Sequence, residues 1–250
     1  MDTQKAIDHG LAMSDEGADI IDVGGESTRP GSKSISEEEE ISRVIPVISA
    51  LAGKTAAVVS VDTTKSEVAK QAVDVGAGMI NDVSTLRGGK ELASIAAKVD
   101  AKLLIMHSRK LPKDMQEEIS YGDVVAEVVK ELEGAVKIAR EAGVSRDNVW
   151  LDPGIGFAKT PEHNLQLLGR LREIVDLGYP VVVGPSRKSF IFDLTGAPVD
   201  RRIGGTAAAV TASIMNGARA VRVHDVATMK QVVTIAHGIV RGSMPGGSHA

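Results

Sequence analysis

Short apolar runs rich in Val and Ile recur along the chain, and each is followed by a longer segment with helical periodicity. Near-continuous apolar runs of this length are expected where a parallel sheet is covered on both faces. The pattern therefore predicts parallel strands joined by helices. The seven runs occupy residues 18–25, 56–63, 78–84, 102–107, 148–154, 180–187 and 218–225.

The segments between the runs show the spacing of amphipathic helices. From Glu67 to Val75 the apolar residues fall on or near one face, and over residues 123–142 they recur at spacings of three and four. Ser36 precedes four glutamates, a pattern typical of a helix N-cap followed by an acidic first turn. The chain opens on a further predicted helix, roughly Thr3 to Glu16.

Alternating strands and helices over 250 residues predict a single α/β domain, residues 1–250, built as a (β/α)8 TIM barrel. Such a barrel has eight strands, whereas the sequence supplies seven apolar runs and opens directly on a helix. We therefore expect the first strand of the barrel, with its following loop, to be missing from this sequence.

Composition narrows the class of protein. The formal net charge of −4 disfavours a nucleic-acid binder, because such proteins depend on a basic surface. The chain has no cysteine, which excludes disulfides, thiolate metal sites and cysteine nucleophiles. No apolar run is long enough to span a membrane, and the first ten residues lack the apolar core of a signal peptide. We expect a cytoplasmic protein that binds neither membranes nor nucleic acid.

Polar residues are concentrated at the carboxyl ends of the predicted strands, where the active site of a barrel lies. A single polar residue there is more often a cap or a core hydrogen bond. Seven strands that all end in such groups would leave unpaired charge in the absence of a ligand. The groups are Asp22, Glu26, Asp62, Asn81, Asp82, His107, Asp152, Ser186, Arg187, Lys188, Arg222, His224 and Asp225.

One set of these residues suits a flat heterocycle. The edge of a 2-amino-4-oxo pyrimidine offers adjacent N–H donors, which one carboxylate accepts in bidentate fashion. An amide both donates and accepts, and an ammonium donates to a ring oxygen or nitrogen. The set comprises Asp62, Asn81, Asp152 and Lys188.

A second set is basic and suits an anion. Arg29 and Arg222 can bind phosphate oxygens through the guanidinium fork, and His224 can donate from a ring nitrogen. Arg29 lies in the glycine-rich loop of residues 24–32, where glycine permits close backbone approach. Neither a G-x-x-x-x-G-K-[ST] phosphate loop nor a G-x-G-x-x-G fingerprint is present, which disfavours nucleotide-binding classes.

Together these motifs resemble the dihydropteroate synthase family. The matching stretches follow the order of the family from about Ala18 to Val226, and they are specific as a set. The resemblance implies a TIM-barrel transferase that condenses 6-hydroxymethyl-7,8-dihydropterin pyrophosphate with para-aminobenzoate in folate biosynthesis, giving 7,8-dihydropteroate and pyrophosphate. The stretches are ADIIDVGGESTRPGS, SVDT, INDVS, MHSRKLPKDMQ, WLDPGIGFAKT, GPSRKSF and RVHDV.

The resemblance also implies roles for individual residues. Residues that would bind the pterin are Asp62, Asn81, Met106, Asp152, Phe157 and Lys188, although Met106 suits a core methionine equally well. Those that would bind the pyrophosphate are Thr28, Arg29, Arg222 and His224. Those that would border para-aminobenzoate are Thr28, Arg29, Ser186 and Lys188. Those that would act in catalysis are Arg29, Lys188, Arg222 and His224.

The family mechanism begins with loss of pyrophosphate, which leaves a carbocation at the pterin methylene for attack by the aniline nitrogen. The resemblance implies Mg²⁺ as the ion on the pyrophosphate and a homodimer as the assembly. In the family, an Asn on the first strand helps to hold this metal. Since that strand has no counterpart in the sequence, no protein ligand of the metal is identifiable.

Two alternatives remain open. A non-catalytic pterin-binding barrel would explain the missing first strand. A pterin-dependent methyltransferase domain, which delivers a methyl group to a corrinoid protein, would share the Asp and Asn contacts with the pterin. The STRP stretch and the Arg-x-His pair argue against the methyltransferase, because that reaction has no pyrophosphate to hold.

Overall fold

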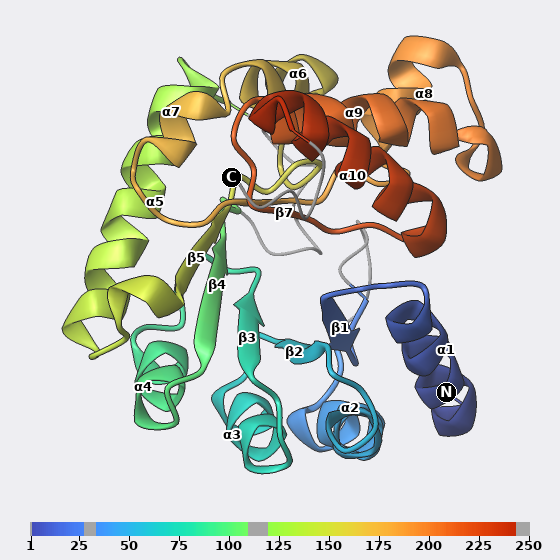
Figure 1. The fold of residues 1–250 in the computed structure, drawn as a ribbon. Coiled ribbons are helices and arrows are strands. Elements are labelled where there is room, and N and C mark those ends of the chain that lie inside the picture. The colour runs from blue at the N-terminus through green and yellow to red at the C-terminus, as the bar shows by residue number, and fades with distance from the viewer. Residues whose placement is uncertain (1, 28–33, 110–119, 244–250) are drawn as a thin grey trace.

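The computed structural model describes residues 2–27, 34–109 and 120–243 of the chain. Thr28 and Arg29, which the sequence analysis places in the site, lie outside these ranges. So does the C-terminal end of the chain, residues 244–250. Within the described ranges the strands form an arc with the helices outside it (Figure 1).

The strands follow one another in chain order, and every pair is parallel. Five of them form one sheet, a single bridge between Leu151 and Val181 leads on to the sixth, and the sixth pairs with the seventh. All seven predicted strands are thus confirmed in their predicted places. They are β1 (Ile20–Gly24), β2 (Val58–Asp62), β3 (Met79–Asp82), β4 (Lys102–Met106), β5 (Val149–Asp152), β6 (Val182–Val183) and β7 (Ala220–Val221).

The last two strands are shorter than the sequence predicts. Their paired residues are only Val182–Val183 and Ala220–Val221, whereas the apolar runs cover residues 180–187 and 218–225. Pro180 and Pro185 flank β6 and have no N–H group to donate to a neighbouring strand. The polar residues that follow each pair therefore lie in loops, and the ladder ends early.

The helices begin and end close to the predicted positions. Ser36 accepts a hydrogen bond from the N–H of Glu39 at 3.2 Å, which confirms it as an N-cap. Asp123 caps the longest helix in the same way. The helices are α1 (Thr3–Asp15), α2 (Glu37–Ala52), α3 (Ser66–Asp74), α4 (Glu91–Lys98), α5 (Val124–Glu141), α6 (Pro161–Gly169), α7 (Arg172–Val175), α8 (Ser189–Thr195), α9 (Ile203–Met215) and α10 (Val226–Arg241). Within the described ranges, no helix combines the length and the apolar character that a membrane crossing requires.

The strands are buried on both sides, as their apolar composition predicts. One apolar cluster packs the outer face of the strands against the helices and includes Ile48, Leu51, Ile80, Leu103 and Leu132. A separate, smaller cluster fills the inside of the arc and takes one side chain from every strand. Its members are Ile20, Val58, Met79, Leu104, Trp150, Val182 and Ala220.

Candidate active site

The inner apolar layer determines which polar side chains reach the mouth of the barrel. Successive side chains of a strand point to opposite faces, so a residue two positions beyond an inward residue also points inward. In parallel strands these positions lie toward the carboxyl ends, where barrel active sites are built. Counting two residues from the inner layer gives Asp22, Ser60, Asn81, Met106, Asp152, Gly184 and Arg222, and Asp62 lies two beyond Ser60.

Four of these side chains form one hydrogen-bonded and ion-paired cluster. Arg222 lies 3.0 Å from Asp22 through Nε and 3.2 Å from Asp62 through a terminal nitrogen. Asn81 donates from Nδ2 to the same Asp22 oxygen, Oδ2, at 3.0 Å. The strand register explains why these side chains meet. Asp62 and Asn81 are paired across β2 and β3, and Asp22 lies two residues before Gly24, which is the partner of Asp62 in β1.

This cluster joins two groups that the sequence analysis treats separately. Asp62 and Asn81 belong to the predicted heterocycle set, and Arg222 belongs to the predicted anion set. Burial and the neighbouring Asp22 raise the pKa of Asp62 to about 7, and Arg222 opposes that shift. The Asp22 carboxylate raises the pKa of the Arg222 guanidinium, which therefore stays charged. The two sets meet at a shared ion pair.

Asp152 and Lys188 lie close enough to this cluster to interact with its charges. Asp152 is 6% exposed and accepts a hydrogen bond from the N–H of Gly154 at 2.6 Å. Burial raises its pKa, while the Gly154 bond and the charges of Lys188, Arg222 and Lys159 lower it. Burial lowers the pKa of Lys188 to about 8, with Asp152 opposing. A buried acid and a partly buried base thus stabilise each other's charged form.

An apolar wall adjoins these charges. Phe157 is 4.2 Å from the Nζ of Lys188, measured to the ring centroid, which is a cation–π contact. Met106 and Phe157 pack together with Val83 and Ala158 in a small buried cluster of their own. This placement suits both the face of a bound ring and a core methionine, so the pterin contact of Met106 stays a prediction.

Ser186 fixes the orientation of His224. The serine hydroxyl accepts the backbone N–H of His224 at 3.2 Å and lies 2.9 Å from the ring Nδ1. With one acceptor interaction already made, the hydroxyl can donate its proton to Nδ1, which leaves the N–H of the ring on Nε2. Burial and the cations Arg187 and Arg222 lower the pKa of His224, so the ring is neutral near pH 7.

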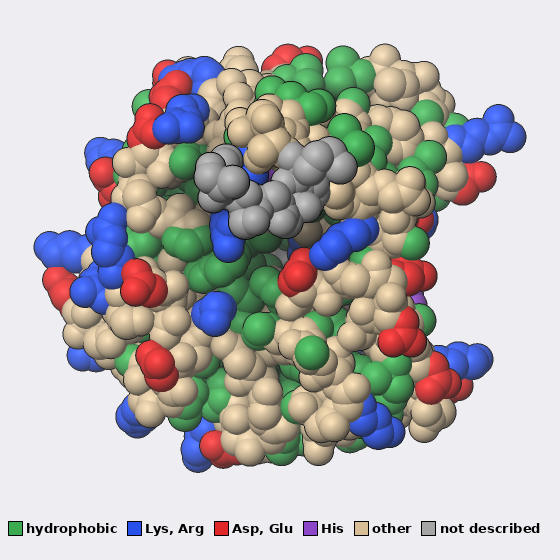
Figure 2. Space-filling view, in the orientation of Figure 1, with side chains coloured by type: hydrophobic (Ala, Val, Ile, Leu, Met, Phe, Trp, Pro, Cys, Tyr) green, Lys and Arg blue, Asp and Glu red, His purple; other side chains and the backbone are tan. Residues whose placement is uncertain are grey.

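A second interaction joins the loop after β6, which carries Ser186, to the loop after β7, which carries His224. Arg187 forms an ion pair with Asp225, with the two side chains joined by contacts of 3.1 Å and 2.5 Å. The predicted residues of both sets that fall in the described ranges therefore lie at one end of the barrel. Figure 2 shows that face hollowed near its centre, with hydrophobic side chains in the hollow and charged side chains at its edge.

Two charged residues at the mouth have no role in the sequence analysis: Asp22 is among the strand-end residues but belongs to neither set, and Lys159 is not among those residues. Asp22 joins the ion-paired cluster, and its sequence signal is the two-residue spacing from the apolar Ile20. Lys159 is only 7% exposed and directly follows the loop that carries Asp152 and Phe157. No sequence spacing distinguishes Lys159 from a surface lysine.

The geometry agrees with comparisons to known proteins. The chain matches the pterin binding enzyme family over residues 1–224. It is 44% identical over 237 residues to the dihydropteroate synthase of Synechocystis sp., which covers 94% of this chain and 82% of that protein.

Solved structures give the same result. The Yersinia pestis dihydropteroate synthase, solved with a sulfonamide drug complex, has a TM-score of 0.92 at 36% identity, covering 97% of this chain and 87% of that one. The Xanthomonas albilineans enzyme in complex with 7,8-dihydropteroate has a TM-score of 0.85 at 38% identity, covering 95% and 85%.

The chain thus belongs to the pterin-binding enzyme family and has its TIM-barrel fold. Within that family it is a member of the dihydropteroate synthases, the transferases that act in folate biosynthesis. The predicted resemblance and fold class are confirmed.

Proposed function

We propose that the chain condenses 6-hydroxymethyl-7,8-dihydropterin pyrophosphate with para-aminobenzoate to give 7,8-dihydropteroate and pyrophosphate. The observation that carries this proposal is the convergence of buried acids, an amide and cations on one mouth of the barrel. Burying the acids Asp62 and Asp152 at such a mouth is costly unless a ligand of matching polarity uses them.

The pterin ring binds between Asp152 and the Asp62–Asn81 pair. The Asp152 carboxylate accepts the N–H groups of the 2-amino-4-oxo edge, and Lys188 donates to a ring oxygen or nitrogen. Asp62 and Asn81 take the remaining polar edge. Phe157 and Met106 supply the apolar contact with the ring, next to the Lys188 ammonium.

Loss of the pyrophosphate is an electrostatic task. The C–O bond to the pterin methylene breaks with its electron pair on the leaving group, so negative charge develops there. Arg222 is already oriented by Asp22 and Asp62, and the neutral His224 ring can donate from Nε2. Thr28 and Arg29 complete this anion site in the proposal.

The second substrate then attacks the methylene cation. The aniline nitrogen of para-aminobenzoate forms the C–N bond and then transfers its extra proton to the released pyrophosphate or to water. Ser186 and Lys188 border its position, with Thr28 and Arg29 from the glycine-rich loop. Holding both substrates in one orientation contributes to the rate, since the aniline is a weak nucleophile.

Mg²⁺ is part of the proposal only as an ion bound with the substrate. Within the described ranges no group of three or more His, Asp or Glu side chains could hold a metal ion. These residues therefore do not fit a preformed metal centre, and the oxygens of the pyrophosphate would be the main ligands. Calorimetry should show that the chain binds the preformed complex of Mg²⁺ and inorganic pyrophosphate, after subtraction of a titration without protein, and does not bind Mg²⁺ alone.

We also propose that the chain forms a homodimer in the cytoplasm. Large apolar side chains are exposed on neighbouring helices α9 and α10, including Met215 at 50%, Ile235 at 66% and Ile239 at 62%. Clustered exposed apolar side chains mark protein–protein contacts more often than free surface. A pyrophosphate ester is highly charged and stays in the compartment where it is made.

The deciding experiment mixes the chain with the pterin pyrophosphate, para-aminobenzoate and Mg²⁺. We expect pyrophosphate release and dihydropteroate formation in equal amounts. Tight pterin binding without turnover would instead favour the non-catalytic barrel. Methyl transfer from a methylated reduced pterin to a corrinoid protein would favour the methyltransferase.

A further inference from the structure

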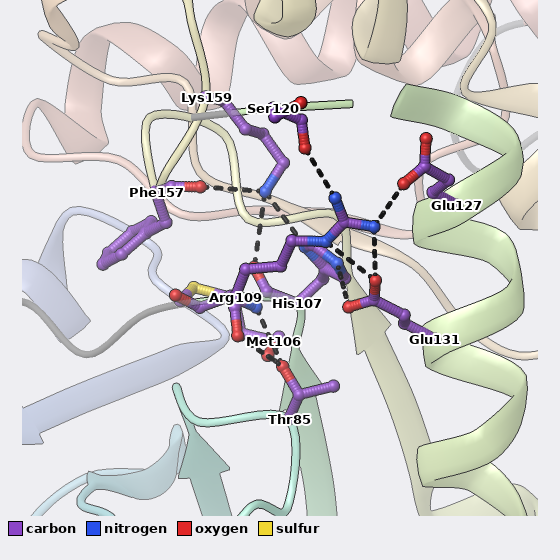
Figure 3. Close-up of polar contacts among 10 residues, drawn as sticks. Thr85, Met106, His107, Arg109, Ser120, Glu127, Glu131, Phe157 and Lys159 are labelled. Atoms are coloured by element: carbon purple, nitrogen blue, oxygen red, sulfur yellow. Dashed lines mark hydrogen bonds and ion pairs between the residues drawn. The ribbon is translucent and has the colours of Figure 1, made fainter. Parts of the chain in front are cut away.

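A buried ammonium, that of Lys159, lies directly behind the pterin face of the mouth and has no role in the proposed reaction. It is surrounded by three acceptors: His107 Nδ1 at 3.1 Å, the Phe157 carbonyl at 3.0 Å and the His107 carbonyl at 3.5 Å (Figure 3). Three acceptors match the three N–H donors of a protonated lysine. Burial lowers the pKa of Lys159 to about 7, so this ammonium titrates near neutral pH, and burying it is costly without a compensating role.

His107 links this ammonium to helix α5. The imidazole is fully buried, and its Nε2 lies 2.9 Å from a carboxylate oxygen of Glu131. Because Nδ1 accepts from Lys159, the ring proton is on Nε2 and is donated to Glu131. Burial lowers the pKa of His107 to about 4, so the ring is neutral and its orientation is fixed. Glu131 is held in turn by Arg109 at 2.8 Å (Figure 3).

Lys159 also holds the loop that supplies the pterin contacts. A Cβ atom at Gly154 would lie 2.0 Å from the His107 carbonyl oxygen and 3.3 Å from the Lys159 Nζ, so the loop runs directly against both. The Phe157 carbonyl accepts from Lys159, while the Phe157 ring contacts Lys188 on the ligand side. The Lys159 ammonium thus holds the backbone between Asp152 and Phe157, the two residues of this loop that are proposed to contact the pterin.

Charge couples Lys159 to the same site. Its positive charge lowers the pKa of Asp152, and the Asp152 charge stabilises the ammonium in return. The charged groups that act on Lys159 come from the end of β5, from the segment after β4, from α5 and from the loop before α8. They are Asp152, Arg109, Glu131 and Lys188.

We propose that Lys159 is a positioning residue of the pterin site. It holds residues 152–157 against His107 and supplies one of the positive charges that keep the Asp152 carboxylate ready to accept N–H groups of the ring. This inference rests on the proposed function, because it takes the pterin as the ligand.

The first test is Lys159→Met, with 6-hydroxymethylpterin binding measured by calorimetry across pH. We expect a several-fold loss of affinity near neutral pH, because the Phe157 carbonyl loses the ammonium that holds this part of the loop. The acidic limb of the binding curve should also move to higher pH, because Asp152 loses a cation that lowers its pKa. The matched control is Lys137→Met on the exposed face of α5, which should bind like the unmodified chain.

This experiment distinguishes failure of the proposed function from failure of the proposed role of Lys159. If the unmodified chain does not bind the pterin, the proposed function fails. If the unmodified chain binds and Lys159→Met gives the same affinity and pH profile, the role of Lys159 is overturned while the function stands. A fall in melting temperature with an unchanged pH profile would mean a structural role only, and would also overturn the inference.

Glu131→Gln is the second variant, and it keeps the test decisive should Lys159→Met fail to fold. Burial lowers the pKa of Lys159 to about 7, and Glu131 opposes this shift. The amide oxygen of the new side chain can still accept from His107, but without the carboxylate charge the Lys159 pKa falls further. We expect pterin affinity several-fold weaker at about pH 7.5 and nearly unchanged at about pH 6. An equal loss at both pH values, or no loss, would contradict the proposal.

Discussion

Replacing Asp152 by Asn separates ring recognition from folding. Asp152 is 6% exposed, ends β5 and accepts the Gly154 N–H at 2.6 Å through one oxygen. The amide oxygen of Asn can keep that bond. Its NH2 group then stands where the second carboxylate oxygen was, and presents a donor to the N–H groups of the pterin.

The expected loss of affinity follows from two terms. One charge-assisted hydrogen bond contributes about 1.5–3 kcal/mol, and a donor left facing a donor costs about 1 kcal/mol more. The sum of about 2.5–4 kcal/mol corresponds to roughly 60- to 700-fold weaker pterin binding, at about 1.4 kcal/mol per factor of ten. Calorimetric titration with 6-hydroxymethylpterin measures this directly.

Although Asp152→Asn should weaken pterin binding, it should not lower the free energy of unfolding at neutral pH. Burial raises the Asp152 pKa above its value in the unfolded chain, so the stability that this group contributes is present below about pH 4 and is lost as pH rises through the folded pKa. An uncharged Asn avoids that loss, and the melting temperature at neutral pH should stay equal or rise.

The control for this experiment is Asp147→Asn, an exposed position far from the mouth, which should leave binding and melting temperature unchanged. Pterin affinity of Asp152→Asn within about threefold of the unmodified chain would refute the recognition argument. A melting temperature lowered by several degrees would show that Asp152 is chiefly a structural group.

Three further changes test other parts of the site and surface. Arg222→Met should reduce turnover of the pterin pyrophosphate by about a hundredfold or more but weaken 6-hydroxymethylpterin less; equal losses in kinetic and calorimetric measurements would contradict the anion-site role. Asp62→Asn should raise the melting temperature over the unmodified chain by an amount that grows between about pH 4 and pH 7, because the Asp62 pKa is raised to about 7; a difference that does not vary with pH would be the opposing result. The double variant Ile235→Glu, Ile239→Glu should be a monomer in light scattering after size exclusion. The control Val99→Glu, which changes an exposed apolar residue elsewhere, should leave the dimer intact. A dimer in both proteins would place the interface on another surface.

The sequence alone determines the elements and their order. Hydrophobic periodicity is a local property, so the runs around Val59 and Ile80 identify buried strands, and Ser36 identifies the start of a helix, with no knowledge of the fold. The strand-end acids and amides also point to a ligand site, since parallel strands end at one edge.

Only the tertiary structure decides which of these groups touch. Arg222 contacts Asp62 across 160 residues of sequence, and it does so because strand register and the curvature of the arc place β7 opposite β2. For the same reason Lys159, an ordinary lysine in the sequence, becomes a buried cation against His107 and Asp152. Electrostatic energies depend on burial and on separations of a few ångströms, and neither quantity is encoded by the spacing of residues along the chain.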